Sequence, residues 1–287
     1  MPIQLNIPAR QWRIQGCSFE EFRGHGYCSF MQIQNKVVIV TGGANGIGRA
    51  LCHRFAREGA RFVAVSDIDA ENGLKVAQEI GSRAAFFRCD VAKEAEVKSL
   101  VDAVTHAAQS VDIFCSNAGI GVIGGPETPD RDWQRSWEIN VMSHVYAARA
   151  VLPQMLARKE GYLLQTISAA GLLTSISSAS YSATKHAALG FAESLAIAYG
   201  DDGVRVSALC PQGVRTNMLK EDYPGVGMLR ETAIEPEQVA DEVVKAMAEE
   251  RFMILPHPEA GKYFQNKAND YDRWIRGMRK IRRAEMG

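Results

Sequence analysis

The sequence lacks an excess of charge of either sign, because 33 Lys and Arg residues balance 33 Asp and Glu residues. A neutral chain has no strong positive field to attract a phosphate backbone, so we expect no nucleic-acid partner. Its six cysteines include no C-x-x-C pair, and His, Cys and carboxylate residues form no cluster with metal-ligand spacing. We therefore expect neither a disulfide framework nor a metal site.

Long hydrophobic runs are also missing. The longest stretch without a charged residue, residues 161–184, contains nine Ser or Thr residues, whose hydroxyls would be costly in hydrocarbon. Charged residues such as Arg10, Arg13 and Glu20 interrupt the first 30 residues, so no signal peptide is predicted. We expect a soluble, cytoplasmic protein without a membrane span.

From residue 36 onward, short apolar runs alternate with longer amphipathic stretches. The stretches have a helical period, as in Ile47, Leu51 and Phe55, which recur every four residues. The runs have the length of strands that are buried on both faces: Val37–Val40, Arg61–Ser66, Ala84–Cys89, Val111–Cys115, Tyr162–Ile167, Val204–Leu209 and Phe252–Leu255. This alternation predicts an α/β fold, a Rossmann-like doubly wound parallel sheet of about seven strands with helices on both faces, in a single domain.

Three regions are predicted along the chain. Residues 1–30 show no clear period and are interpreted either as an arm that packs on the body or as the product of an upstream start site. Residues 31–256 are expected to form a dinucleotide-binding catalytic domain, with a substrate lid at about 217–235. Residues 257–287 contain a run of basic residues that favours a solvated helical tail over one that binds an anionic surface.

A glycine-rich segment, Thr41-Gly42-Gly43-Ala44-Asn45-Gly46-Ile47-Gly48, lies between the first predicted strand and a predicted helix. Glycines let the backbone turn tightly and approach a pyrophosphate, while the helix N-terminus offers free N–H groups to that anion. Asp67 ends the next predicted strand, 19 positions after Gly48. A carboxylate there accepts hydrogen bonds from ribose hydroxyls and repels a 2′-phosphate. The segment predicts NAD as the cofactor in preference to NADP, the alternative being that Asp67 is an ordinary loop residue.

The order of motifs resembles the short-chain dehydrogenase/reductase family from residue 36 to about 255. The motifs are Thr41-Gly42-x-x-x-Gly46-x-Gly48, Asp90-Val91, Asn117-Ala118-Gly119, Asn140, Ser168, Tyr181-x-x-x-Lys185 and Pro211-Gln212-Gly213-Val214-Arg215-Thr216. A Tyr-x-x-x-Lys pair alone arises often by chance, but the whole set in this order is specific. The resemblance implies an oxidoreductase that uses a nicotinamide dinucleotide.

Tyr181 and Lys185 are four residues apart on a predicted helix, so they share one face. A phenol has a pKa of about 10, and a neighbouring ammonium favours the phenolate, so we expect Lys185 to lower the pKa of Tyr181 and make it a general acid/base. The resemblance implies that Lys185 also binds the nicotinamide ribose, that Ser168 holds the substrate oxygen and that Asn140 anchors a water of a proton relay.

The cofactor-binding residues follow from the same motifs. Asp90 would contact the adenine, and Val214 and Thr216 the nicotinamide carboxamide. The full set is Gly42, Asn45, Gly46, Ile47, Gly48, Asp67, Asp90, Val91, Asn117, Ala118, Gly119, Tyr181, Lys185, Pro211, Val214 and Thr216. Three histidines on predicted helices, His106, His144 and His186, are interpreted as surface or packing residues.

Three positions depart from the family pattern. Ser116 precedes Asn117 where the family has a second asparagine, and Gln212 follows Pro211 where it has glycine, which leaves that loop's geometry open. A Val-Asp-Gly-Gly segment, which serves tetramer contacts in many members, is replaced by residues 252–258. We therefore expect a homodimer through the helices that carry Asn140 and Tyr181, with a tetramer as the alternative.

The function predicted from these residues is hydride transfer between NAD and a secondary alcohol or ketone. Apolar residues in the variable segments favour a hydrophobic substrate, namely Val122, Ile123, Leu172, Leu173, Met218, Leu219, Met228 and Leu229. The alternatives are an NAD(P)H-dependent ketoreductase, since the same residues work in both directions, and a non-catalytic dinucleotide-binding sensor.

Overall fold

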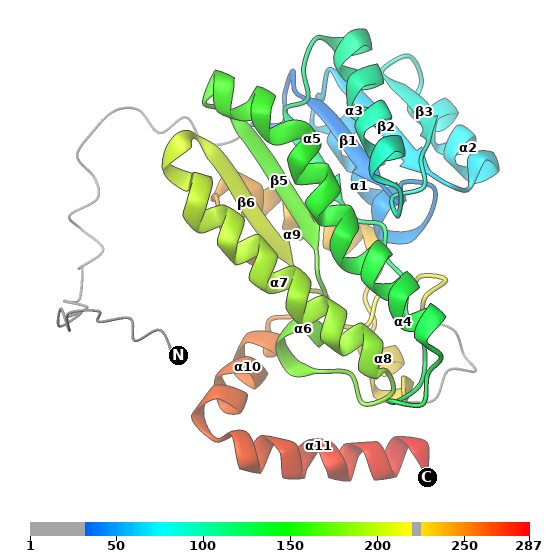
Figure 1. Ribbon diagram of the computed structural model, residues 1–287, viewed down its shortest axis with the longest axis vertical. Helices are drawn as coiled ribbons and strands as arrows, with labels where there is room; N and C mark the ends of the chain where they lie inside the picture. Colours follow the sequence, from blue (N-terminus) through cyan, green and yellow to red (C-terminus); the bar gives the residue numbers. More distant parts are fainter. Residues whose placement is uncertain (1–31, 220–224) are drawn as a thin grey trace, which may run out of the picture.

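The computed structural model describes residues 32–219 and 225–287, in which a seven-stranded sheet forms the centre (Figure 1). All neighbouring strands are parallel, in the order β3-β2-β1-β4-β5-β6-β7. The strands are β1 (Val37–Thr41), β2 (Phe62–Asp67), β3 (Ala84–Arg88), β4 (Ile113–Ser116), β5 (Gly161–Thr166), β6 (Val204–Leu209) and β7 (Met253–Ile254). The predicted doubly wound fold is confirmed.

Helices cover both faces of the sheet (Figure 1). Helices α1 (Gly46–Arg57), α2 (Ala70–Ile80) and α9 (Pro236–Ala248) pack on one face, and α3 (Glu94–Ala108), α5 (Ser143–Arg158) and α7 (Ala179–Tyr199) on the other. A helix α4 (Asp130–Trp137) continues through a π-helical turn η1 (Glu138–Met142) into α5, and a short 3₁₀ turn η2 (Gly200–Asp202) follows α7.

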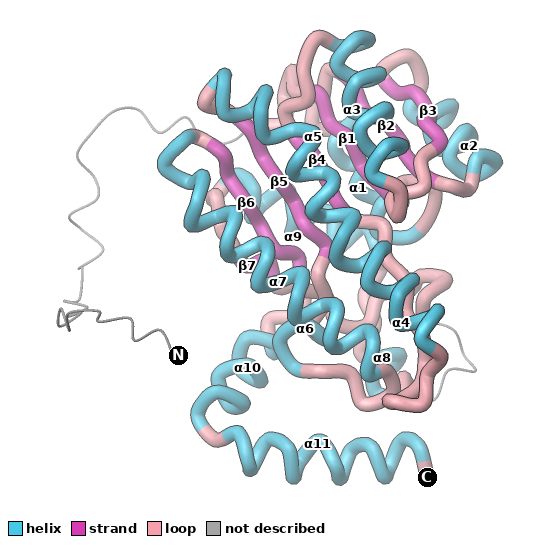
Figure 2. Tube along the Cα trace, in the orientation of Figure 1, coloured by secondary structure: helices cyan, strands magenta, loops and turns pink. Residues whose placement is uncertain are grey.

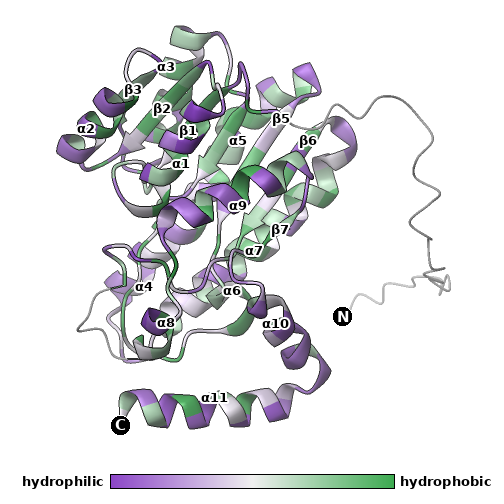
Figure 3. Cartoon of the chain, turned by 180° about the vertical axis from the view of Figure 1, so that it is seen from behind, coloured by the Kyte–Doolittle hydropathy of each residue, from purple (hydrophilic) through white to green (hydrophobic). Residues whose placement is uncertain are grey.

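Side chains of the central strands divide alternately between two hydrophobic cores. In β1, Val37 and Ile39 face the core under α3, α5 and α7, whereas Val38 and Val40 face the core under α1 and α9. All four are fully buried, as expected where helices cover both faces of a parallel sheet. The apolar interior strands contrast with the mixed helices around them (Figure 3).

The strand order reverses between β1 and β4, since the chain runs outward from β1 to β3 and then returns to β4. Ligands of open α/β sheets bind at the carboxyl ends of the strands beside such a switch point. Three short or terminal helices and the irregular segments gather at this end (Figures 1 and 2): α6 (Ala170–Leu173), α8 (Gly227–Glu231) and α10 (Glu259–Asn269).

The predicted helical tail consists of α10 and α11 (Tyr271–Met286). Helix α10 is docked, because Lys267 is only 5 % exposed and its Nζ donates to the Leu172 carbonyl of α6 at 2.6 Å. Helix α11 has no buried residue and runs beneath α6 and α8 (Figure 1). The expectation of a solvated tail thus fits α11 but not Lys267.

The predicted lid at 217–235 is described in part, because residues 220–224 lie outside the described residues, as does the segment 1–30. In the described ranges, none of the helices combines the length and apolar character needed to cross a membrane. The same ranges contain no group of three His, Cys, Asp or Glu residues arranged to hold a metal ion.

Candidate active site

The glycine segment between β1 and α1 brings its backbone against two neighbouring loops. Gly42 and Gly46 adopt φ values of 66° and 51°, which side-chain-bearing residues rarely take. A Cβ on Gly46 would lie 2.8 Å from the Thr216 side chain, and one on Gly48 would lie 2.0 Å from the Gly42 carbonyl oxygen. The segment therefore requires glycine both for its turn and for its close packing.

The first turn of α1 is open towards this segment. The N-cap residue Asn45 does not cap the turn, because its side-chain amide donates to Asp69 at 3.2 Å instead. No acidic side chain lies in the first turn, which consists of residues 46–49. The free N–H groups and the positive end of the helix dipole are thus available to an anion.

Asp67, at the end of β2, accepts hydrogen bonds from two backbone groups. Its Oδ2 accepts from Ala44 N and its Oδ1 from Asp69 N, both at 3.0 Å. The carboxylate therefore holds the glycine segment in place and stands next to it at the carboxyl edge of the sheet. Each oxygen retains acceptor capacity for a further donor.

Asn117, just beyond β4, joins three strands at the switch point. Its side-chain amide donates to the Thr41 carbonyl at 3.1 Å, and its Oδ1 accepts from the Thr166 hydroxyl of β5 at 3.1 Å. The Thr41 hydroxyl accepts in turn from Asn117 N at 3.0 Å. This network fixes the floor of the site, and Ser116 before Asn117 does not disrupt it.

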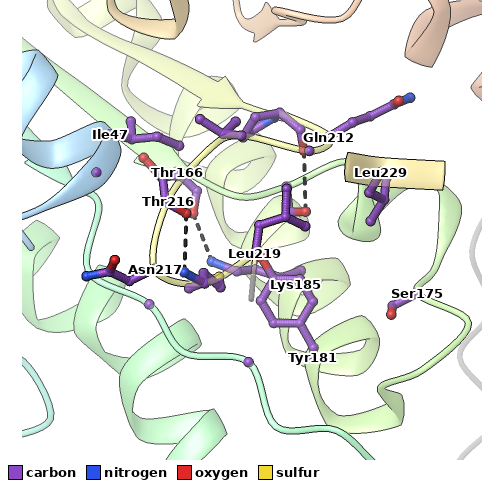
Figure 4. Close-up of a pocket in the computed structure, with 18 of the residues that line it drawn as sticks. Ile47, Thr166, Ser175, Tyr181, Lys185, Gln212, Thr216, Asn217, Leu219 and Leu229 are labelled. Carbon is purple, nitrogen blue, oxygen red and sulfur yellow. Dashed lines mark hydrogen bonds between the residues drawn. The ribbon is translucent and has the colours of Figure 1, made fainter. Parts of the chain in front are cut away.

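Tyr181 and Lys185 lie on the first two turns of α7, which begins with a serine cap. The Ser178 hydroxyl accepts from Tyr181 N at 3.1 Å and so fixes the start of the helix. The Lys185 Nζ donates to the Thr166 carbonyl at 2.9 Å and lies 5.6 Å from the centre of the Tyr181 ring. Figure 4 shows the two side chains next to each other at the cavity.

Ser168 follows β5 in a strained conformation. Its φ is 149°, within the range that favours glycine, and its hydroxyl accepts from Ala170 N at 3.1 Å. The same hydroxyl lies 3.5 Å from the Pro211 carbonyl. These hydrogen bonds hold the hydroxyl at the cavity wall that also contains Tyr181.

The pKa values of Tyr181 and Lys185 are both shifted by burial. Burial raises the pKa of Tyr181 above its usual value, and hydrogen bonding by Ser168 acts in the opposite direction. Burial lowers the pKa of Lys185 to about 8. The lowering of the Tyr181 pKa by Lys185 stays a prediction, because the groups that shift this pKa here are burial, Ser168 and Cys210.

Asn140 lies behind the cavity, on the π-helical turn η1, and is fully buried. Its Oδ1 accepts from Ile120 N and its Nδ2 donates to Ile120 O, both at 2.9 Å. Nδ2 also donates to the Thr184 hydroxyl of α7 at 3.1 Å. A Cβ on Gly119 would lie 3.3 Å from Asn140 Oδ1 and 3.4 Å from Lys185 Nζ, so these three groups converge.

A cavity of about 430 Å³ lies between the glycine segment and α7 (Figure 4). Its wall contains most of the predicted site residues, namely Gly42, Asn45, Gly46, Ile47, Asn117, Ala118, Gly119, Ser168, Tyr181, Lys185, Pro211, Val214 and Thr216. Gly48, Asp67, Asp90 and Asn140 do not belong to its wall, and Val91 belongs to the hydrophobic core.

The apolar part of the wall differs from the prediction. Ile123, Met218, Leu219 and Leu229 line the cavity, but Val122, Met228, Leu172 and Leu173 do not. Both leucines turn inward on the single turn α6 and belong to the core under α7. A four-residue helix has no period from which its buried face could be predicted.

Thr166 and Thr184 are site residues that the motifs did not single out. Thr166 contacts both Asn117 and Lys185, while Thr184 contacts Asn140. Thr184 stands inside the Tyr181–Lys185 motif, so its position was a usable signal. Thr166 ends an apolar run and carries no such signal.

His144 is a packing residue, as predicted, but an unusual one. It is fully buried, its ring nitrogens contact no hydrogen-bonding partner within the described ranges, and burial lowers its pKa to about 3.

A parallel sheet with a glycine segment at its switch point, and a Ser–Tyr–Lys group across the cavity, defines a dinucleotide-binding oxidoreductase fold. Comparison with known proteins specifies the family. Residues 36–226 match the family model of the short chain dehydrogenases. The chain belongs to the short-chain dehydrogenase/reductase family and is an oxidoreductase, which confirms the predicted resemblance.

Named relatives cover most of the chain. It is 34 % identical over 252 residues to 1-deoxy-11-beta-hydroxypentalenate dehydrogenase of Streptomyces exfoliatus, covering 85 % of this chain and 91 % of that protein. It is 34 % identical over 218 residues to meso-2,3-butanediol dehydrogenase of Serratia marcescens, covering 73 % of this chain and 86 % of that protein. A short-chain dehydrogenase/reductase from Burkholderia phymatum, solved in complex with NAD, superposes with a TM-score of 0.77 at 29 % identity, covering 84 % and 96 % of the two chains.

Proposed function

We propose that the protein transfers a hydride between NAD and a hydrophobic secondary alcohol or ketone, with Tyr181 as the general acid/base. The observation that carries this proposal is the placement of Ser168, Tyr181 and Lys185 on one wall of a cavity whose other wall is the glycine segment. Dehydrogenase names among the relatives, and NAD in the related Burkholderia phymatum structure, agree with it.

The residues present fit a nicotinamide dinucleotide. Gly42 and Gly46 leave the segment without side chains where a Cβ would contact Ala118 or Thr216, and the open first turn of α1 faces the same space. These groups would hold the pyrophosphate, and Asn117, Gly119, Val214 and Thr216 would hold the nicotinamide end. When bound, the cofactor supplies the hydride acceptor or donor.

The protein groups supply proton transfer and orientation. The Ser168 hydroxyl is fixed beside Tyr181 and would donate to or accept from the substrate oxygen. Tyr181 exchanges the proton of that oxygen, and the Lys185 ammonium stabilises the phenolate that results. Asn140 is hydrogen-bonded to the backbone of Ile120 and to Thr184 of α7, behind the cavity. In this proposal, a proton relay through water leaves the site on that side.

NAD is preferred over NADP in this proposal because of Asp67. Its carboxylate is anchored by Ala44 N and Asp69 N at the edge of the glycine segment. A fixed negative charge there favours ribose hydroxyls as donors and opposes a 2′-phosphate. Asp90 and Val91 lie outside the cavity wall and, in this proposal, contact the adenine end only.

The substrate is proposed to be hydrophobic because apolar side chains form much of the remaining wall. Ile123, Met218, Leu219, Val226 and Leu229 line the cavity, and they come from three different segments. The relatives range from a 1-deoxy-11-beta-hydroxypentalenate dehydrogenase to a meso-2,3-butanediol dehydrogenase, so their names do not decide the size of the substrate.

Other properties complete the proposal. The enzyme is proposed to act in the cytoplasm as a homodimer through the helices that carry Asn140 and Tyr181, with a tetramer as the alternative. A ketoreductase working with NAD(P)H uses the same residues in reverse, but Asp67 disfavours NADPH. A non-catalytic sensor has no need of Tyr181 and Lys185 at the cavity.

The test is turnover by the purified full chain with NAD and with NADP across a panel of secondary alcohols. The panel pairs bulky cyclic alcohols with short polyols, and the reverse reaction uses the matching ketones. We expect NAD-dependent oxidation that is faster with the bulky alcohols. Turnover of short polyols alone would reject the hydrophobic substrate, and NADP preference would reject the role of Asp67.

A further inference from the structure

The segment after β7 reaches back to the cofactor side of the cavity. It begins with Pro256-His257-Pro258 and leads into α10, beyond the residues 36–226 that match the family model. His257 is only 3 % exposed, although a neutral histidine on a loop would ordinarily retain contact with water. Its position is therefore set by a specific contact.

That contact is with Gln212, the residue that replaces the family glycine. Gln212 N donates to His257 Nδ1 at 3.2 Å. Its neighbours on the loop have backbone partners instead: Ile234 N donates to Gly213 O at 3.2 Å, and Arg215 N donates to Ile234 O at 3.0 Å. The imidazole thus supplies a side-chain acceptor for this run of backbone groups.

The loop is enclosed from the opposite side as well. A Cβ on Gly213 would lie 2.0 Å from the Leu229 carbonyl oxygen of α8, so the two backbones are in close contact. Pro211 O accepts from Ala169 N at 2.8 Å, next to Ser168. The segment 211–216 is therefore held between α8, the Ser168 turn and His257, and it presents Val214 and Thr216 to the cavity.

The protonation state of His257 follows from its geometry. An imidazole nitrogen that accepts a hydrogen bond carries no proton, so the ring is neutral with its proton on Nε2. Burial agrees, because it lowers the pKa of His257 below its usual value, although Glu259 and the backbone of Gly213 and Thr232 act in the opposite direction. A protonated ring would present two donors and would lose the bond to Gln212.

We propose that His257 is a positioning residue for cofactor binding: its neutral ring accepts the Gln212 N–H and so fixes the segment 211–216 in the wall of the cavity. This inference rests on the proposed function, because the segment binds the nicotinamide end only if the cavity holds a dinucleotide. It assigns a role to a residue outside the family match, and it explains how the loop keeps its shape without the family glycine.

The test compares His257→Asn with His257→Leu in the full chain. The Asn amide oxygen is bonded to Cγ, as Nδ1 is in His, so His257→Asn keeps an acceptor close to the same place. Leu fills similar space without an acceptor. We expect Leu to raise the dissociation constant and the KM for NAD by about fivefold to tenfold, the usual worth of a buried backbone hydrogen bond. Asn should stay within about twofold of the wild type, and kcat should change less than KM in both variants.

Hydrogen–deuterium exchange without added cofactor gives an independent readout. The peptide that contains residues 211–216 should exchange faster in the Leu variant than in the wild type or the Asn variant. If Leu does not fold, as judged by thermal unfolding, His257→Gln replaces it, because its amide oxygen lies one bond farther away and should not rescue.

The outcomes separate the two proposals. If the wild-type protein binds no dinucleotide, the proposed function is wrong. The exchange rates would then still show whether His257 fixes the segment 211–216. The role of His257 would be overturned if the Leu variant kept the wild-type affinity for NAD and the wild-type exchange rate of residues 211–216. It would also be overturned if the Asn and Leu variants lost NAD affinity equally.

Discussion

The two walls of the cavity are built by different means. The wall formed by the glycine segment acts mainly through its backbone, since Gly42 and Gly46, and Gly48 packed against Gly42, each stand where a side chain would collide or strain the turn. The wall from β5, β6 and α7 acts through side chains, above all Ser168 and Tyr181. A backbone wall recognises a constant cofactor part, whereas a side-chain wall can vary with the substrate and carries the proton chemistry.

Tyr181→Phe tests the side-chain wall and should have the largest effect. It removes the hydroxyl that exchanges the proton, so kcat should fall by about 10²- to 10⁴-fold, while NAD affinity stays nearly unchanged. Steady-state kinetics and dinucleotide titration measure the two quantities. Tyr199→Phe, at the far end of the same helix, is the matched control and should retain activity. Survival of turnover in the Tyr181 variant would reject the mechanism.

Gly48→Ala tests the backbone wall. Its Cβ would lie 2.0 Å from the Gly42 carbonyl oxygen, so the segment must shift, and such overpacking costs about 1–3 kcal/mol. We expect NAD affinity to fall by about tenfold or more, with a lower melting temperature. The control is Gly190→Ala, exposed on α7 with no described atom within 4 Å of an added Cβ, which should be neutral or slightly stabilising. Equal behaviour of the two variants would show that the backbone wall tolerates side chains.

The same contrast explains how much could be predicted from the sequence. The backbone wall was predictable, because glycines at fixed spacing between a strand and a helix indicate a tight turn that other residues rarely adopt. The doubly wound parallel sheet was predictable from the alternation of elements and the handedness of their crossovers, whereas its strand order was not predicted. The side-chain wall was predictable only where a motif marks it, as Tyr181 and Lys185 do.

The remainder depends on tertiary contacts that leave no local pattern. Leu172 and Leu173 turned inward because α6 packs against α7, which no spacing reveals. The direction of the Tyr181 pKa shift depends on how completely the folded chain excludes water. His257 meets Gln212 across 45 positions of sequence, through a loop that departs from the family pattern.

Asp67 lies outside the cavity wall and supports the backbone wall through its side chain, which accepts from Ala44 N. Replacing it with Ser removes the charge that opposes a 2′-phosphate, and hydrogen bonds to charged groups are worth about 1.5–3 kcal/mol. We expect the ratio of kcat/KM for NAD to that for NADP to fall by about tenfold or more in Asp67→Ser. Glu71→Gln removes the same charge from the exposed first turn of α2 and should leave the ratio unchanged. An unaltered ratio in the Asp67 variant would mean that the choice of cofactor is made elsewhere.

The smallest expected effect concerns helix α11 of the tail. This helix follows the residues that match the family model and contacts residues next to the side-chain wall. The Glu285 carboxylate of α11 accepts from Gly227 N at 3.0 Å, and Arg282 donates to the Ile176 carbonyl at 2.5 Å. Gly227 and Ile176 adjoin Val226, Ser175 and Ser177, which line the cavity, so the last turn of α11 contacts two segments next to the cavity wall.

Exposed charged contacts contribute about 0.2–1 kcal/mol, so Glu285→Gln should raise KM for bulky alcohols by about twofold to fivefold and leave kcat and the KM for NAD unchanged. Asp272→Asn, an exposed carboxylate in the first turn of the same helix, removes the same charge and is the control. Because these contacts of α11 fall on Gly227 and Ile176 rather than on the glycine segment, an increase confined to bulky alcohols would assign the tail to the substrate side. An equal rise in the KM for NAD would show instead that the two walls are coupled through the lid.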